Sequence, residues 1–189
     1  MKNRLSDQER ILLLELARQA IIEAVNGRKP PAIGLKNLPL VLQQPGASFV
    51  TLSCKGQLRG CIGALEPYQP LAEDVREHAV AAAIEDFRFP PVQPGELLEI
   101  EIEISCLSLP TPLEYNGPVD LLEKIRPGID GVILRDGSQR ATFLPQVWEK
   151  LPNKADFLAH LCQKMGAPAD LWRRKKIQVF VYQVEEFHE

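Results

Sequence analysis

The sequence predicts an α+β protein in which helices flank a mixed, largely antiparallel sheet. The clearest strand is 98–106, where apolar residues alternate strictly with three glutamates and a serine. Such alternation is typical of a sheet with one buried and one solvated face. The turn sequences Lys55-Gly56-Gln57 and Asp136-Gly137 each join two short β-rich segments and predict hairpins. Helical segments alternate irregularly with these strands, and the glycine-rich phosphate loops of nucleotide-binding folds are missing.

A helix is predicted close to the N-terminus. Ser6 and Glu9 match a capping box, in which each residue satisfies a backbone donor of the other. Apolar residues then recur at helical spacing as far as Gly27, a residue that favours a helix C-terminus. The following segment, 28–48, is rich in proline and glycine and predicts an irregular connection with at most a short helix.

The remaining elements follow from hydrophobic periodicity and from turn residues. Further helices are expected at 70–86, 119–125 and 156–165, and another is expected to begin at Pro168. Strands are expected at 49–54, 58–62, 98–106, 131–135, 140–144 and 177–184. The segment Phe87–Pro91 cannot continue the preceding helix, because proline lacks an N–H and restricts the residue before it.

Composition and charge indicate a globular protein and argue against several classes. The chain has 189 residues, of which 45% are hydrophobic and 25% charged, enough for a substantial core. The net charge is −3, and the densest basic cluster, 173–176, is interpreted as a helix end, so nucleic-acid binding is not expected. No run approaches the roughly 20 apolar residues that span a bilayer, and no signal peptide is evident, so a cytoplasmic protein is expected.

The four cysteines are widely spaced and include no C-x-x-C pair. A structural zinc site is therefore not expected, and a chain of this length does not require a disulfide framework. Three of them, Cys54, Cys106 and Cys162, have apolar neighbours and are assigned to the core.

The segment 58–63, Leu-Arg-Gly-Cys-Ile-Gly, is the candidate functional site. On an extended strand Arg59 and Cys61 would project from the same face, and a guanidinium near a thiol favours the reactive thiolate. Gly60 and Gly63 could leave backbone donors open beside the thiol, because glycine within a strand marks a bulge or a close approach. These features outline a covalent or anion-binding site. The alternative is that Cys61 is a small buried side chain.

Other candidate residues have structural alternatives. His78 is the one plausible base for Cys61, but a lone helical histidine more often has a surface or capping role. Asp86 and Arg88 flank a turn, where they could hold an anion or pair with each other to fix the loop. The glutamates of 98–106 could suggest metal or acid–base chemistry, but their strict alternation favours a solvated sheet face. No metal-ligand spacing and no cofactor motif are evident.

Leu58–Gly63, followed by Asp86–Pro91, resembles the AMMECR family, whose bacterial and archaeal members are called AmmeMemoRadiSam system protein A. Further matching segments are Glu101–Ser105, Phe143–Val147 and Leu161–Gly166. The resemblance covers nearly all of 1–189 as a single domain. It implies a larger and a smaller subdomain around a cleft, and an association with Memo-like and radical S-adenosylmethionine proteins. The candidate ligand-binding residues beside Cys61 are then Arg59, Gly60, Ile62, Gly63, Asp86 and Arg88.

Three functions remain open. In the first, the protein is an accessory component of a modification system whose cleft binds a small anionic ligand or a partner's tail through Arg59. In the second, it is an enzyme with Cys61 as nucleophile, and Arg59 stabilises the thiolate or a substrate anion. In the third, it is a scaffold that contacts partners through the loops 28–48 and 109–118. The lack of an evident base favours the binding role.

Overall fold

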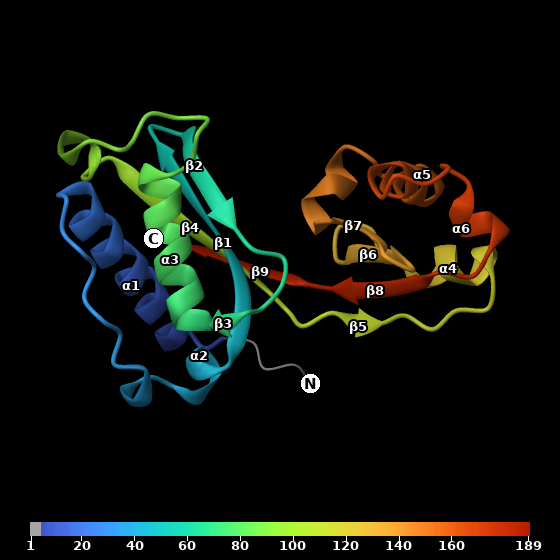
Figure 1. The fold of residues 1–189 in the computed structure, drawn as a ribbon, viewed down its shortest axis with the longest axis horizontal. Coiled ribbons are helices and arrows are strands. Elements are labelled where there is room, and N and C mark those ends of the chain that lie inside the picture. Colours follow the sequence, from blue (N-terminus) through green and yellow to red (C-terminus); the bar gives the residue numbers. More distant parts are fainter. Residues whose placement is uncertain (1–4) are drawn as a thin grey trace. The chain divides into compact units, whose positions relative to one another are not determined.

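The computed structural model describes residues 5–189, which form two compact units (Figure 1). The first unit contains the described residues up to Leu107 together with Glu185–Glu189, and the second contains Ser108–Val184. Each unit combines helices with antiparallel strand pairs around its own apolar core, which confirms the α+β class. None of the helices within residues 5–189 is long and apolar enough to cross a membrane. The cleft between subdomains stays a prediction.

The first unit is a sheet with helices packed on one face. Its strands lie in the order β2 (Gln57–Gly63), β1 (Pro45–Cys54), β4 (Ile100–Leu107) and β9 (Val184–His188), and β3 (Gln69–Pro70) pairs with the start of β1. Its helices are α1 (Asp7–Val25), α2 (Leu40–Gln43) and α3 (Leu71–Ile84), with 3-10 turns at Leu35–Asn37 and Pro94–Glu96. Figure 1 shows α1 and α3 on the same side of this sheet. The pairings of β1 with β2 and β4 are antiparallel.

The sequence patterns explain these elements. The predicted capping box opens α1: the N–H of Ser6 donates to Glu9 Oε2 (2.7 Å), and the N–H of Glu9 donates to Ser6 Oγ (3.3 Å). The apolar faces of α1 and α3 meet the isoleucines of β4 in the first core. The alternation along β4 is confirmed, since its isoleucines are buried while Glu101 and Glu103 are exposed on the other face.

The predicted closing strand, 177–184, is divided between the two sheets. Its first part is β8 (Gln178–Tyr182) of the second unit, and the chain then continues into β9 of the first. At the change, the N–H of Gln183 donates to Ser108 Oγ (2.9 Å) and the N–H of Ser108 donates to the carbonyl of Gln183 (2.8 Å). The sequence has no turn signal that marks this break, because no glycine or proline lies between Ile177 and His188.

The second unit has its own antiparallel sheet. The strands lie in the order β5 (Thr111–Pro112), β8, β6 (Gly131–Asp136) and β7 (Gln139–Phe143), and β6 and β7 form the second predicted hairpin. The helices are α4 (Pro118–Lys124), α5 (Lys154–Lys164) and α6 (Leu171–Arg174), with a 3-10 turn at Pro145–Glu149. In the core, the rings of Trp148 and Phe157 stack with centroids 3.6 Å apart. Both tryptophans of the protein, Trp148 and Trp172, lie in this unit.

Candidate functional site

The signature segment 58–63 lies on β2, which forms an edge of the first sheet. Cys61 pairs across from Thr51 on β1, and Thr51 pairs across from Glu103 on β4. A β-bulge shifts the register, so that Arg59 is the extra residue between two paired positions of β2. A bulge breaks the two-residue alternation of side chains. The prediction that Arg59 and Cys61 share a face assumed unbroken alternation.

Both glycines of the segment are required by the protein's own packing. A Cβ atom on Gly60 would lie 2.1 Å from the carbonyl oxygen of Ala82, because the backbone of α3 lies directly against β2. A Cβ on Gly63 would lie 2.4 Å from the carbonyl oxygen of Ser48 and from the ring of Phe49. The close approach expected at these glycines therefore comes from neighbouring elements of the same unit. Ile62, between them, is half-buried and packs against the first core.

Arg59 binds a carboxylate rather than the thiol. Its Nε and Nη2 atoms donate to the two carboxylate oxygens of Glu96 (2.8 and 3.0 Å), and Nη1 donates to the carbonyl of Pro90 (2.7 Å). This bidentate contact raises the pKa of Arg59 and lowers the pKa of Glu96. The Arg59 side chain is only 14% exposed. Arg59 therefore fastens the loop that contains Pro90 and Glu96 to β2.

Asp86 and Arg88 bind the main chain of Cys61 at the edge of the sheet. The N–H of Cys61 donates to Asp86 Oδ2 (2.9 Å), and Arg88 Nη2 donates to the carbonyl of Cys61 (3.0 Å). Arg88 also donates to both carboxylate oxygens of Asp86, from Nε (2.9 Å) and from Nη2 (2.6 Å). These two side chains, the Asp86–Arg88 clip, satisfy the backbone groups that an edge strand leaves unpaired.

The clip is a strongly coupled ion pair. The Asp86 side chain is 2% exposed and that of Arg88 is 44% exposed. The pKa of Asp86 lies far below its ordinary value, first because the Arg88 side chain donates to the carboxylate, and also because the N–H groups of Cys61 and Arg88 donate to it. The N–H of Cys61 is therefore not available to bind an anionic ligand, because it already donates to the carboxylate of Asp86.

The cation next to Cys61 is Arg88, whereas the sequence predicted Arg59. The thiol is half-buried, and the hydroxyl of Thr51 donates to its sulfur (3.3 Å). The pKa of Arg88 is raised first by its hydrogen bond to Asp86 and further by its charge interaction and hydrogen bond with Cys61. Arg59 has its charge interactions with Glu96 and Cys54 instead. The guanidinium beside the thiol is therefore that of Arg88.

The other three cysteines have unreactive surroundings. Cys106 and Cys162 are buried as expected, and burial raises the pKa of both thiols, to about 12 for Cys106. Cys54 is only half-buried, at the margin of the first core, with its sulfur 3.7 Å from Glu99 Oε2. Its pKa is raised first by desolvation and then by the negative charge of Glu99.

His78 lies on the opposite face of the sheet from Cys61. Since Gly60 faces α3, the alternation along β2 places the Cys61 side chain on the other face. His78 is buried on α3, with Nδ1 3.2 Å from Asp74 Oδ2, and the hydroxyl of Ser48 donates to the same oxygen (2.6 Å). His78 therefore belongs to a buried polar cluster, and the hypothesis that it is the base for Cys61 is wrong.

The structure thus brings only some of the predicted residues together. Cys61, Asp86 and Arg88 are in direct contact. Sequence reasoning missed Thr51, which the pairing register places across from Cys61, and Glu96, whose signal was its spacing of three from Gln93 in a capping pattern. Within residues 5–189, no three His, Cys, Asp or Glu side chains gather so that they could hold a metal ion.

Comparison with known proteins identifies the family. The model of the AMMECR1 family matches residues 14–187. A protein from Methanothermobacter thermautotrophicus is 42% identical over 98% of this chain and 96% of its own length, and one from Methanopyrus kandleri is 38% identical over all of this chain and 92% of its own. The crystal structure of an uncharacterised protein from Pyrococcus horikoshii superposes with a TM-score of 0.79 at 34% identity, over 98% of this chain and 93% of that one. The chain therefore belongs to the AMMECR1 family.

Proposed function

We propose that the protein is a binding, accessory component of a modification system, and that its ligand or partner is held at Cys61 by Arg88. The observation that carries this proposal is the Asp86–Arg88 clip, in which a buried carboxylate fixes a half-exposed guanidinium against the main chain of Cys61, a half-buried residue. A cation that is already immobilised loses little conformational entropy when it binds an anion.

The chemistry of Arg88 favours an anionic group, such as the carboxylate of a small molecule or of a partner's tail. The bonds to Asp86 and to the carbonyl of Cys61 use Nε and Nη2. The N–H groups of Nη1 lie on the same guanidinium and can donate to an incoming oxygen. Charge-assisted hydrogen bonds of this kind are about twice as strong as neutral ones.

The enzyme hypothesis has one specific observation in its favour. The hydroxyl of Thr51 donates to the Cys61 thiol, and the Arg88 guanidinium is bound to the main-chain carbonyl of the same residue. Donors and cations around a thiol support a thiolate nucleophile. Against it, the first unit offers no histidine as base: His78 lies across the sheet, and His188 is on β9 at the far edge. The binding role requires no base.

The pH dependence of thiol alkylation, with each modified cysteine located by mass spectrometry, separates the two functions. The binding role predicts that Cys61 is no more reactive towards the reagent than the other three cysteines. Cys106 and Cys162, with raised pKa values, are internal controls that should stay unmodified in the folded protein. Alkylation of Cys61 alone, with a midpoint well below that of a free thiol, would instead support the nucleophile.

The proposed partners are Memo-like and radical S-adenosylmethionine proteins. Co-elution of the full chain with a purified Memo-like protein should be lost in Arg88→Gln, because the substitution removes the charge. It should persist in Cys61→Ser and in Arg59→Gln, since the Arg59 side chain is directed to Glu96 and Pro90. Equal binding by Arg88→Gln and the unaltered chain would exclude Arg88 as the contact.

A further inference from the structure

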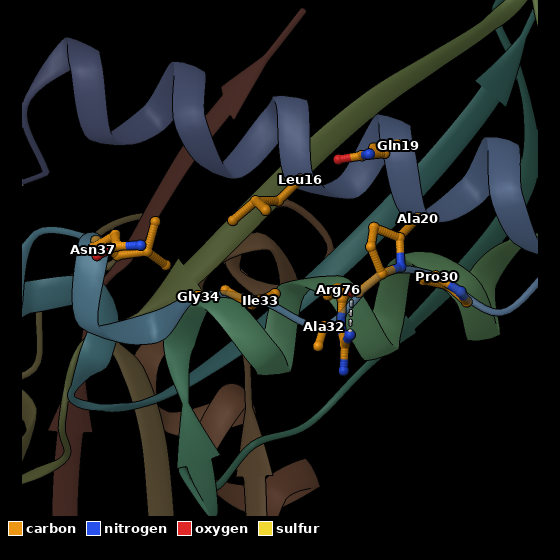
Figure 2. A pocket seen from close by; sticks show the side chains of 11 residues that line it. Leu16, Gln19, Ala20, Pro30, Ala32, Ile33, Gly34, Asn37 and Arg76 are labelled. Atoms are coloured by element: carbon orange, nitrogen blue, oxygen red, sulfur yellow. Dashed lines mark hydrogen bonds between the residues drawn. The ribbon is translucent and has the colours of Figure 1, made fainter.

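A hollow lies in the first unit, and none of the Cys61, Asp86 and Arg88 side chains lines it. It is formed between α1, the segment 30–38 and Arg76 on α3 (Figure 2). Its volume is about 250 Å³. A water molecule occupies about 30 Å³ in the liquid, so this volume equals that of roughly eight water molecules. The hollow is therefore large enough for a small organic molecule.

The walls of this hollow are mainly hydrocarbon. Leu16 and Ala20 from α1 face Pro30, Ile33 and Leu38 of the segment 30–38. Figure 2 shows Leu16 and Ile33 in the middle, with Asn37 towards one end and Arg76 towards the other. Apolar walls with a few convergent polar groups are the usual make-up of small-molecule sites.

The charge in the hollow is of one sign. Arg76 is the charged residue among those that line it, and Gln19 and Asn37 add amide groups; none of the lining residues, all within the described part of the chain, is acidic. Arg76 Nη1 donates to the carbonyl of Pro31 (2.9 Å), and Nη2 pairs with Glu73 (2.5 Å), which does not line the hollow. These two contacts hold the guanidinium in place and leave it with N–H groups for a ligand, since arginine has five.

Few main-chain hydrogen bonds tie the outer wall of the hollow to the rest of the unit. Pro30 and Pro31 have no N–H. The backbone hydrogen bonds of 33–38 run within that segment, from Leu35 to Ile33, from Asn37 to Gly34 and from Leu38 to Leu35. The hydrogen bond from Arg76 to the carbonyl of Pro31 ties the proline pair to α3. Segments with few bonds of this kind open at low free energy and are commonly those that respond to ligands.

We propose that this hollow binds a small aliphatic carboxylate, with the hydrocarbon against Leu16 and Ile33 and the carboxylate on Arg76. The size of the hollow, its apolar walls and its single positive charge all point to this class. The site is independent of the function proposed for Cys61, because the two share no residue.

Hexanoate is the probe, titrated into the full-length chain and followed by ¹H–¹⁵N NMR. A molecule of this size is expected to bind with a Kd on the order of 1 mM. Resonances of residues 16–20 and 32–38 should shift together. Hexan-1-ol, which lacks the charge, should bind about tenfold more weakly, and hexylammonium should not bind, since a charge-assisted bond to Arg76 carries the difference.

Matched variants test the role of Arg76. Arg76→Gln should weaken hexanoate binding about tenfold and leave hexan-1-ol binding unchanged. Arg28→Gln is the control, because Arg28 also pairs with a glutamate, Glu23, but does not line the hollow. Ala32→Trp, at an exposed position of the wall, should block both probes with Arg76 intact.

Three results would contradict carboxylate binding in this hollow. Hexanoate that shifts no resonance in 32–38, that binds Arg76→Gln as tightly as the unaltered chain, or that is unaffected by Ala32→Trp would overturn it. If Arg76→Gln fails to fold, Ala32→Trp and the comparison of the three probes decide the question.

Discussion

Replacing Asp86 with alanine is expected to destabilise the first unit by about 2–3 kcal/mol. The carboxylate is almost fully buried and accepts hydrogen bonds from the N–H groups of Cys61 and Arg88 and from the Arg88 side chain. Alanine would leave the N–H groups of Cys61 and Arg88 without their acceptor at a position that is buried by the Asp86 side chain. The Arg88 guanidinium, which is 44% exposed, would lose its counter-charge but could still be hydrated, so the cost comes mainly from the unsatisfied donors.

The distribution of aromatic residues allows this loss to be assigned to one unit. Because Trp148 and Trp172 both lie in the second unit, their fluorescence reports on that unit, whereas far-UV circular dichroism reports on both. In urea, Asp86→Ala should shift the dichroism transition to lower denaturant. Unchanged transitions by both probes would mean that the clip contributes little to stability.

The second unit contains a matched control. Asp130 is also 2% exposed and accepts from the N–H, Nε and Nη2 of Arg126 (3.1, 3.0 and 2.6 Å). Asp130→Ala should therefore shift the tryptophan transition of the second unit. Similar losses in the two variants would show that Asp86 is structural, whereas a loss of ligand or partner binding in Asp86→Ala but not in Asp130→Ala would link the clip to the site.

The clip also predicts a dependence on pH. The pKa of Asp86 is lowered in the folded protein from an ordinary value of 3.8, so the unfolded chain takes up the proton first as the pH falls. The stabilisation is therefore fully present above about pH 4 and is lost progressively below it. Asp86→Asn, measured by urea unfolding between pH 6 and pH 2, should show a smaller loss in acid than the unaltered chain.

Much of the fold could be predicted because its signals are local. The alternation of β4, the capping box at Ser6 and the turn glycine Gly137 each determine their own element from neighbouring residues. The division of 177–184 between two sheets could not be predicted in this way, because Gln183 changes sheets through its contacts with Ser108, which is distant in sequence.

The candidate site shows the same limit. Cys61, Asp86 and Arg88 could be selected from the sequence by residue type and position, but their partners could not. A single bulge in β2 interrupts the alternation of side chains between Arg59 and Cys61, so their faces cannot be inferred from spacing. Thr51 lies beside the thiol because the two strands pair in this register, which the sequence does not reveal. His78 was a candidate by residue type, but α3 packs on the face of the sheet opposite the Cys61 side chain, and His78 there contacts Asp74, one turn earlier on the same helix.

Gly60→Ala is the second substitution with a large expected effect, a destabilisation of about 3 kcal/mol or more. The added Cβ would lie 2.1 Å from the carbonyl oxygen of Ala82 and 3.0 Å from its carbonyl carbon. These are backbone atoms of α3, so no rotation of a side chain can relieve the clash and the helix must move away from β2. Overpacking of this kind commonly costs about 1–3 kcal/mol, and a rigid neighbour raises the cost.

Gly95→Ala is the matched control, because a Cβ there meets no atom within 4 Å. It should change stability by no more than about 0.5 kcal/mol in the same urea titration followed by circular dichroism. Equal stability of the two variants would contradict the close approach of α3.

The comparison of Gly60→Ala with Gly95→Ala also distinguishes two roles for Gly60: making room for α3, or making room for a ligand. If Gly60 accommodates α3, stability falls first and binding at Cys61 weakens only as the strand moves. If Gly60 instead leaves room for a ligand, binding is lost in a chain that is as stable as Gly95→Ala.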